Sequence, residues 1–195
     1  MQYHLIGLAQ QYARTAHEPI FAITKSGIKR PQIMHIQEVA DLVWVSGGND
    51  IEILAAWLHD SVEDTSITLV DIKEKFGKQV ANIVHGLTDL DSYKSLPVME
   101  RKLMQANRVK NENSSVKRIK LADQISNVQF LSTDPINTMT FDECKSYIIG
   151  AKIIADECKG ISPLLDDLFN NAYKLGIKKY KITYNHEKDF LQIAS

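Results

Sequence analysis

The amino-acid sequence predicts an all-α protein, and three features support this prediction. Apolar residues recur every three or four positions over most of the chain, the breaks between these stretches are short, and helix-capping residues stand at several of their starts. Strand-like alternation is confined to 180–193, where we expect a short C-terminal β-hairpin. At 195 residues, 44% of them hydrophobic and 24% charged, the chain suits a single domain over 1–195. We expect its core at 5–175 and an accessory tail at 176–195.

The helices expected in the first half are separated by clear stop signals. A loop rich in Lys, Gly and Pro follows the first helix, and Gly47-Gly48 ends the second. Asn49 or Asp50 can cap the third helix, and Thr68 can cap the fourth, which stops at Gly77. We therefore expect helices at 5–16, 33–45, 50–60, 68–76 and 78–87.

Longer helices are expected in the second half. Pro97 occupies a favoured helix start, Ser114 or Ser115 opens the following helix, and Asp134-Pro135 marks the break after it. These signals place helices at 97–110, 114–131, 141–158 and 163–175.

Composition and charge exclude several classes of protein. The formal net charge of −1 argues against general affinity for nucleic acid or for an anionic membrane. No apolar run approaches the roughly 20 residues that cross a bilayer, and no signal-like segment starts the chain, so we expect a cytoplasmic protein. Cys144 and Cys158 fall about 21 Å apart on one expected helix, beyond disulfide reach, so we expect reduced thiols.

Four ionisable residues crowd the end of the third helix. His59 and Asp60 follow the apolar run 53–58 directly, and residues four apart share a helix face, which places Glu63 with His59 and Asp64 with Asp60. His and Asp together can hold a cation that lowers the pKa of bound water and neutralises phosphoryl oxygens. The motif therefore predicts a metallo-phosphohydrolase site. The alternative is a solvated helix terminus that only caps the next segment.

A second acidic motif lies at 120–127. Asp123 and Asn127 are four residues apart and Lys120 precedes Asp123 by three, so all three can face one cleft. Asp123 could instead only balance Lys120 on a helix surface. The neighbouring residues are apolar on nearly every side, however, so this helix is expected to be buried and its carboxylate needs a partner such as a metal ion.

One further histidine would complete such a ligand set. The candidates are His4, His17, His35, His85 and His186. His35 is the best of these, because it begins a helix just after a loop with Lys25, Lys29 and Arg30, where phosphate-binding cations would arrive with the ligand. Without the other ligands, His35 would more simply be a partly buried structural histidine.

The ordered set of His35, His59-Asp60 and Asp123 resembles the HD-domain superfamily of metal-dependent phosphohydrolases. Within it, the chain is most similar to the hydrolase domain of the Rel/SpoT alarmone enzymes and their small stand-alone relatives of the Mesh1 type. The similarity covers roughly 5–175. Further marks of it are Glu63-Asp64-Thr65, Phe76-Gly77, Glu100-Arg101-Lys102, and Lys120-Leu121-Ala122-Asp123 with Asn127.

The resemblance implies an HD-domain helical bundle with a divalent metal, commonly Mn²⁺. It implies that the metal ligands are His35, His59, Asp60 and Asp123. Glu63 and Asp64 would then assist catalysis. The implied reaction is attack of metal-activated water on the 3′ diphosphate of guanosine 3′,5′-bis-diphosphate (ppGpp), which gives GDP and pyrophosphate.

The resemblance also implies contacts to a small-molecule nucleotide. Lys25 would meet a substrate phosphate, Asn127 would lie near the ribose, and Tyr147 would contact the nucleotide. The chain departs from the family pattern next to Lys25, where Thr24 replaces an arginine that packs on guanine, so a cationic stacking surface is lost. Other departures are the segment 18–23, Gln32 and Ile36.

Three functions remain open at the level of the sequence. The first is hydrolysis of ppGpp, which the intact set of ligand and acid residues favours. The second is a phosphohydrolase of the same fold that acts on another nucleotide, such as a nucleoside monophosphate or an NADPH-like cofactor, which the substitution at Thr24 favours. The third is a non-catalytic nucleotide sensor, for which Glu63 and Asp64 would serve no purpose.

Overall fold

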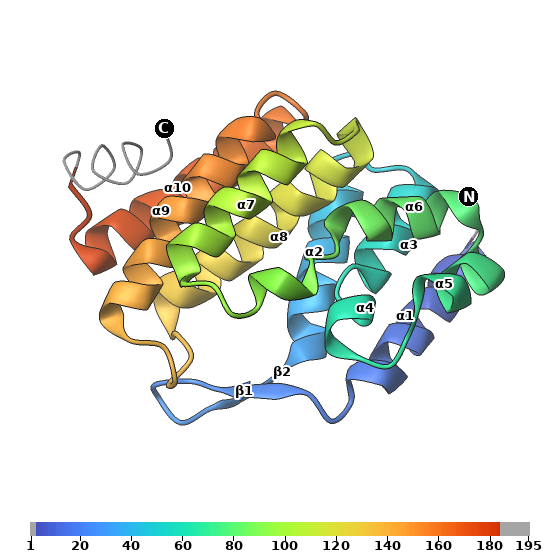
Figure 1. Ribbon diagram of the computed structural model, residues 1–195, viewed down its shortest axis with the longest axis horizontal. Coiled ribbons are helices and arrows are strands. Elements are labelled where there is room, and N and C mark those ends of the chain that lie inside the picture. Colours follow the sequence, from blue (N-terminus) through green and yellow to red (C-terminus); the bar gives the residue numbers. More distant parts are fainter. Residues whose placement is uncertain (1–2, 184–195) are drawn as a thin grey trace.

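The computed structural model describes residues 3–183, and their architecture is helical (Figure 1). The first part of the chain forms α1 (Tyr3–His17), β1 (Phe21–Ile23), β2 (Lys29–Pro31), α2 (Gln32–Val45), α3 (Asp50–Leu58), α4 (Ser61–Asp64), α5 (Leu69–Phe76) and α6 (Lys78–Leu87). The second part forms the 3-10 turn η1 (Asp91–Tyr93), α7 (Val98–Lys110), α8 (Ser114–Thr133), α9 (Phe141–Glu157) and α10 (Pro163–Tyr180). The all-α prediction is confirmed.

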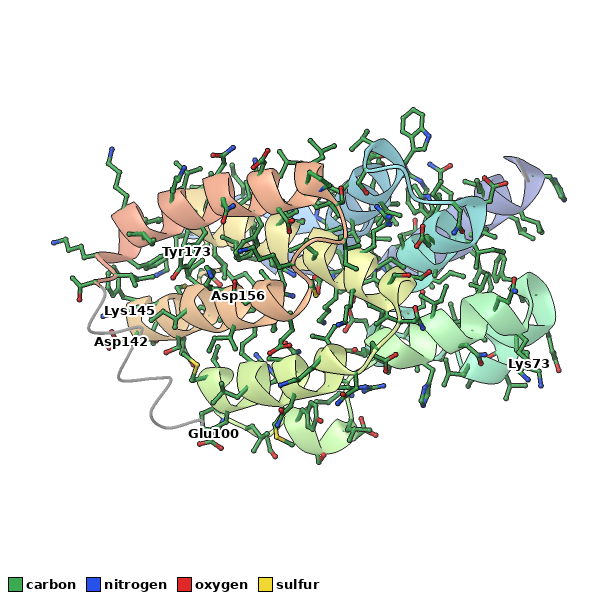
Figure 2. All side chains as sticks on the ribbon, turned by 90° about the horizontal axis from the view of Figure 1, so that it is seen from above. Lys73, Glu100, Asp142, Lys145, Asp156 and Tyr173 are labelled. Carbon is green, nitrogen blue, oxygen red and sulfur yellow. The ribbon has the colours of Figure 1, made fainter. Side chains whose placement is uncertain are left out.

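The helix α8 lies at the centre of the bundle. It packs against α2 on one side and against α9 and α10 on the other, while α7 covers α9 (Figure 1). The helix α3 lies against α1, α2 and α6. One cluster of buried apolar residues runs from Ala9 in α1 to Tyr180 in α10. Exposed charged residues such as Lys73 of α5 and Glu100 of α7 point away from this core (Figure 2).

Helix starts follow from local side-chain chemistry. Asn49 and Thr68 cap α3 and α5 in capping boxes, as expected. The helix α8 begins at Ser114, as expected, and its cap is Asn113, whose side-chain oxygen accepts hydrogen bonds from two backbone N–H groups. Asparagine is at least as good a cap as serine, and here it stands one position before the helix.

The loop expected between the first two helices contains a short antiparallel hairpin. The strands β1 and β2 pair with Phe21 opposite Pro31, and Thr24 makes an isolated bridge with Ile136 in the loop between α8 and α9. Each strand has only three residues, too few for the alternation that predicts a strand from sequence. The hairpin leads directly into α2 and so helps to fix where that helix starts.

The C-terminal end differs from the expectation where it is described. The helix α10 continues to Tyr180 rather than ending at 175, because the Tyr180 hydroxyl donates a 2.6 Å hydrogen bond to the backbone carbonyl of Leu131 in α8. The hairpin expected at 180–193 otherwise lies outside the described residues.

The two cysteines agree with the expectation of reduced thiols. Cys144 and Cys158 are buried free thiols, and burial raises the pKa of Cys158 to about 12. Among residues 3–183, no helix is both long enough and apolar enough to span a membrane.

The helices α7 and α9 approach each other closely at Gly150. A Cβ atom at this position would stand 2.6 Å from Cγ of Lys102. Lys102 is buried, its Nζ donates a 2.9 Å hydrogen bond to Gln124, and the ammonium lies 3.6 Å from the centre of the Tyr147 ring. The glycine therefore lets a buried lysine of α7 pass α9 and reach α8.

We predict that Gly150→Ala lowers the free energy of unfolding by about 1–3 kcal/mol, because overpacking outweighs the gain in helix propensity of about 1 kcal/mol. Gly7→Ala in α1 is a matched control, since nothing lies within 4 Å of the added Cβ, and it should stabilise the protein by up to about 1 kcal/mol. Urea unfolding followed by circular dichroism measures both. Equal stabilisation by the two substitutions would contradict the close approach at Gly150.

Candidate metal centre and active site

Three possible metal ligands from three helices converge in the interior. His35 lies in the second turn of α2, His59 follows the last residue of α3, and Asp123 lies in the middle of α8. One ligand atom from each residue falls within 4.8 Å of the others, and all three side chains are buried. The His35 Nε2 atom is 3.4 Å from Oδ1 of Asp123.

Asp60 completes the group. Its Oδ1 is 3.2 Å from Nε2 of His59, and its Oδ2 is 3.6 Å from Nε2 of His35. The structure therefore brings together all four residues that the family resemblance names as metal ligands. They lie far apart in the sequence, and the packing of α3 and α8 against α2 is what joins them.

The break between α3 and α4 orients His59. The backbone remains helical through His59, so the Nδ1–H group can donate a 2.7 Å hydrogen bond to the carbonyl of Ala56, one turn earlier. The Nε2 atom, which then carries a lone pair, is buried and has no hydrogen-bond partner within residues 3–183. Burial lowers the pKa of His59 and favours the neutral, ligand-competent imidazole. A cation would satisfy this buried nitrogen.

The carboxylates around His35 favour positive charge at the same place. Burial alone would lower the pKa of His35, but a hydrogen bond to Asp123 and the charges of Asp60 and Asp123 raise it. The negative charges of Asp60 and Asp123 would stabilise either a proton on Nε2 or a divalent cation bound there.

Asp123 is held ionised by its neighbours. Lys120 Nζ lies 3.2 Å from its Oδ2, Gln124 donates a 2.8 Å bond to the same oxygen, and Asn127 donates a 2.5 Å bond to Oδ1. Burial would raise the pKa of this carboxyl, but Lys120 and then His35 keep it well below its usual range. The expectation that Lys120, Asp123 and Asn127 face one cleft is confirmed, because all three line the same pocket.

Glu63 and Asp64 lie in α4, which follows His59 and Asp60 directly in the chain. Burial raises the pKa of Glu63 to about 7, even though its Oε1 accepts a 2.6 Å hydrogen bond from the backbone N–H of Asp89. Burial and the nearby Asp60 raise the pKa of Asp64 to about 6. Two carboxyl groups that titrate close to neutral pH can donate or accept protons there.

A pocket of about 220 Å³ opens onto these groups. Its wall contains the four candidate ligands, Glu63 and four basic residues. The residues that line it are Gln32, His35, His59, Asp60, Glu63, Leu87, Asp89, Lys94, Arg101, Lys102, Gln105, Lys120, Asp123, Asn127 and Tyr147. This mixture suits an anionic, phosphorylated ligand next to a metal ion.

The three residues expected to contact substrate are placed differently. Asn127 and Tyr147 line the pocket. Lys25 does not: it is exposed in the turn between β1 and β2, and its backbone N–H bonds to the carbonyl of Pro135. Thr24 is buried, and its Oγ1 accepts the backbone N–H of Ile28, so it shapes the turn.

Sequence reasoning missed several residues of the pocket. Gln32 donates a 2.9 Å hydrogen bond to Asp60, and Asp89 contacts Glu63. Arg101 lines the pocket, and its guanidinium makes no hydrogen bond or ion pair within the described part of the chain. Arg101 belongs to the motif Glu100-Arg101-Lys102, for which the sequence predicts no role. The apolar pattern of α7 does not predict the direction of its charged side chains.

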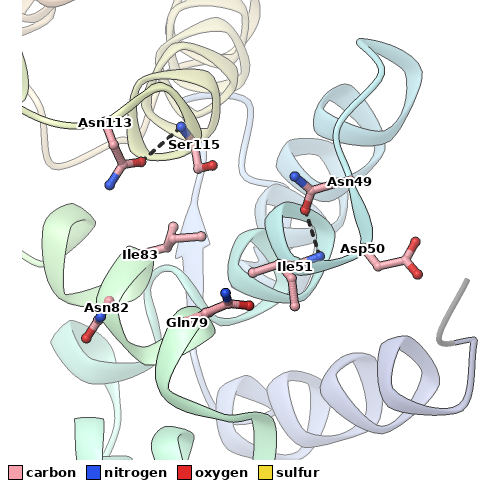
Figure 3. Close-up of a pocket in the computed structure, with 8 residues that line it drawn as sticks. All are labelled: Asn49, Asp50, Ile51, Gln79, Asn82, Ile83, Asn113 and Ser115. Atoms are coloured by element: carbon pink, nitrogen blue, oxygen red, sulfur yellow. Dashed lines mark hydrogen bonds between the residues drawn. The ribbon is translucent and has the colours of Figure 1, made fainter.

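A larger hollow of about 680 Å³ lies elsewhere, between the starts of α3 and α8 and the face of α6 (Figure 3). Half of the residues that line it carry neutral amide side chains. Two of them, Asn49 and Asn113, have their oxygens engaged in capping the backbone N–H groups of Ile51 and Ser115 (Figure 3). Size alone does not identify the functional site, because this hollow lacks the cluster of His and acidic groups.

The fold and the set of two buried histidines, buried Asp123 and half-buried Asp60 define a metal-dependent phosphohydrolase of the HD type. The sequence matches the HD domain family model over residues 9–145. Relatives named guanosine-3′,5′-bis(diphosphate) 3′-pyrophosphohydrolase MESH1 occur in Xenopus tropicalis and Homo sapiens. The Xenopus protein is 33% identical over 147 residues, which is 74% of this chain and 80% of that protein. The human protein is 32% identical over 146 residues, 74% of this chain and 80% of that protein.

A solved structure supports the same grouping. The structure of a metazoan SpoT ortholog described as hydrolysing ppGpp superposes with a TM-score of 0.78 at 27% identity, over 87% of this chain and 94% of that one. This chain belongs to the HD-domain family and, within it, to the group that contains the MESH1 proteins.

The raised pKa of Glu63 predicts a pH-dependent cost to stability. A carboxyl with a pKa of 4.5 when unfolded and about 7 when folded keeps its proton better in the folded state, so stability is lost as the pH rises from 4.5 through 7. Glu63→Gln removes this loss, and in metal-free protein at pH 8 it should raise the free energy of unfolding by about 1–2 kcal/mol, with partial exposure considered.

Urea unfolding in a chelating buffer at pH 4 and pH 8 measures this effect. The variant and the original protein should have similar stability at pH 4 and diverge by pH 8. A variant that is less stable at pH 8 would show that Glu63 is not held in a destabilising position.

Proposed function

We propose that this protein hydrolyses ppGpp to GDP and pyrophosphate with the help of a divalent metal ion. The observation that carries the proposal is the convergence of two imidazole nitrogens and two carboxylates in a pocket that is also lined by basic side chains. The relatives named above are described as acting on this substrate.

His35, His59, Asp60 and Asp123 would hold the metal. The buried, unpartnered Nε2 of His59 supports this assignment, since such an atom is costly unless a ligand satisfies it. When bound, the metal would lower the pKa of water and neutralise charge on phosphoryl oxygens. We propose Mn²⁺, which accepts mixed nitrogen and oxygen ligands and is common in the family that the sequence resembles.

Glu63 and Asp64 would handle protons. Glu63 lines the pocket next to Asp60, and its pKa of about 7 lets it accept a proton from attacking water and release it again near neutral pH. Asp64 is joined to the ligands through Gln32, which donates to the carboxylates of both Asp60 and Asp64. We propose Glu63 as the principal proton carrier and Asp64 as its assistant.

The cationic wall would bind the phosphates. Arg101 has no partner within the described residues and presents a planar guanidinium to the pocket, which suits a phosphate. A space of about 220 Å³ is small for a whole nucleotide, so we propose that the diphosphate enters and the nucleoside lies across the rim, near Asn127 and Tyr147. Lys25 would meet a phosphate at the outer edge.

Thr24 favours a second candidate function, hydrolysis of another nucleotide by the same metal chemistry. Its side chain is buried and hydrogen-bonded within the hairpin turn, so it offers no surface on which guanine could stack. A nucleoside monophosphate or an NADPH-like cofactor would then be the substrate.

We further propose that residues 1–195 form one domain, because the described helices share one core.

A panel of nucleotides with added Mn²⁺ tests the substrate. We expect pyrophosphate release from ppGpp and at least tenfold slower phosphate release from GMP, AMP and NADPH at equal concentration. Ion chromatography of the products measures both. Turnover of another member with ppGpp untouched would support the second candidate, and no turnover in the panel would reject both.

Paired substitutions separate metal binding from proton transfer. Asp123→Ala should abolish both metal retention and turnover with the fold kept, and Asp60→Ala should do the same. Glu63→Gln should retain the metal and lower kcat by about 10²–10⁴-fold, the usual contribution of a proton carrier. Metal analysis of the purified variants beside their kinetics makes the distinction. Full activity of Asp123→Ala would show that the ligand set is wrong.

A further inference from the structure

The side of the His35 ring that faces away from the pocket is tied into a hydrogen-bonded chain. Its Nδ1 atom is 2.9 Å from Oγ of Ser126 in α8, and Ser126 Oγ is 2.6 Å from Oε2 of Glu38, one turn after His35 in α2. Arg30 of β2 contacts the same Glu38 oxygen at 2.7 Å. The chain therefore joins the hairpin, α2 and α8 behind a proposed metal ligand.

The donors and acceptors of this chain can be arranged in only one way. Arg30 can only donate, and ionised Glu38 can only accept, so the single hydroxyl proton of Ser126 goes to Glu38. The Ser126 oxygen can then only accept from His35, which places a proton on Nδ1. The Nε2 atom of His35 is left as the metal-facing nitrogen, next to Asp60 and Asp123.

The chain is also held rigidly. His35 is 4% exposed and Ser126 is 3% exposed, so both side chains are fixed by packing. The Arg30 guanidinium lies 4.2 Å from the centre of the Phe130 ring and has only 15% of its side chain exposed. Glu38 is thus anchored from one side by a stacked arginine and from the other by a buried serine.

We propose that Glu38 and Ser126 are positioning residues that fix the tautomer and orientation of His35 and thereby set the affinity of the site for a divalent cation. Outer partners of this kind commonly change metal affinity by about 10–100-fold. The inference rests on the metal site proposed above. Within this hydrogen-bonded chain, only His35 would touch the metal, and Glu38 and Ser126 would act on the metal site through His35.

The test is a Mn²⁺ titration of chelator-stripped, full-length protein, in which the electron paramagnetic resonance signal of free Mn²⁺ reports the Kd. Ser126→Ala and Glu38→Gln should each raise the Kd about 10–100-fold. Asp41→Asn is the matched control: Asp41 lines the same surface hollow as Glu38, but within residues 3–183 Ser126 bonds to Glu38 and not to Asp41, so the Kd of this variant should stay within twofold. Ser126→Thr keeps the hydroxyl and should restore the Kd to within threefold of the original protein.

The outcomes separate this inference from the proposed function. Tight Mn²⁺ binding by the original protein with an unchanged Kd in Ser126→Ala and Glu38→Gln would overturn the positioning role and leave the metal site standing. Absence of Mn²⁺ binding by the original protein would overturn both. If Ser126 and Glu38 act on stability alone, the metal-free variants should unfold at a lower midpoint, and Ser126→Thr should not restore the Kd. That result would also overturn the inference.

Discussion

Two imidazole nitrogens and two carboxylates converge inside this protein. Burying so many hydrogen-bond acceptors costs free energy unless donors or a cation satisfy them, so the neighbouring side chains are arranged to supply donors. Asp123 is stabilised by Lys120 and by the side-chain amides of Gln124 and Asn127. His59 is oriented by the carbonyl of Ala56. The Nε2 atom of His59 has no hydrogen-bond partner within residues 3–183, and its near neighbour is the Asp60 carboxylate at 3.2 Å, so a cation could lie between the two groups.

The fold supplies this arrangement through two local features. The helix α3 is apolar and buried through Leu58, and the short break before α4 turns His59 and Asp60 toward one point. The helix α8 is buried over most of its length yet carries Asp123, Gln124 and Ser126 on its inner side. Ordinary core packing of α2 against α3 and α8 therefore brings the ligands together, and the same packing places Glu38 behind His35.

Much of the fold could be predicted, and so could the residues that converge at the candidate metal site, because both depend on short-range patterns and on shared motifs. Apolar periodicity located the helices, and Leu58-His59-Asp60 with Lys120-Leu121-Ala122-Asp123 pointed to the residues that the structure brings together. The contact from Ser126 to Glu38 joins residues 88 positions apart and could not be predicted, since nothing local distinguishes that serine. The three-residue strands were missed because they are shorter than the pattern that identifies strands.

The proposed reaction and the proposed substrate depend on different parts of the protein. The four converging His and Asp side chains lie in or near the core, whereas Thr24 and Lys25 lie in the turn of the β1–β2 hairpin. Under the proposed function, the reaction type rests on the interior and nucleotide preference rests on the rim. Both follow from one claim, that the four converging side chains bind a single cation.

The measurement that tests this claim most directly is anomalous-difference density from crystals grown with Mn²⁺. The account predicts one peak within bonding distance of Nε2 of His35, Nε2 of His59 and a carboxylate oxygen of both Asp60 and Asp123. A peak only in the amide-lined hollow near Asn49 and Asn113, or none between the four side chains at saturating Mn²⁺, would contradict it.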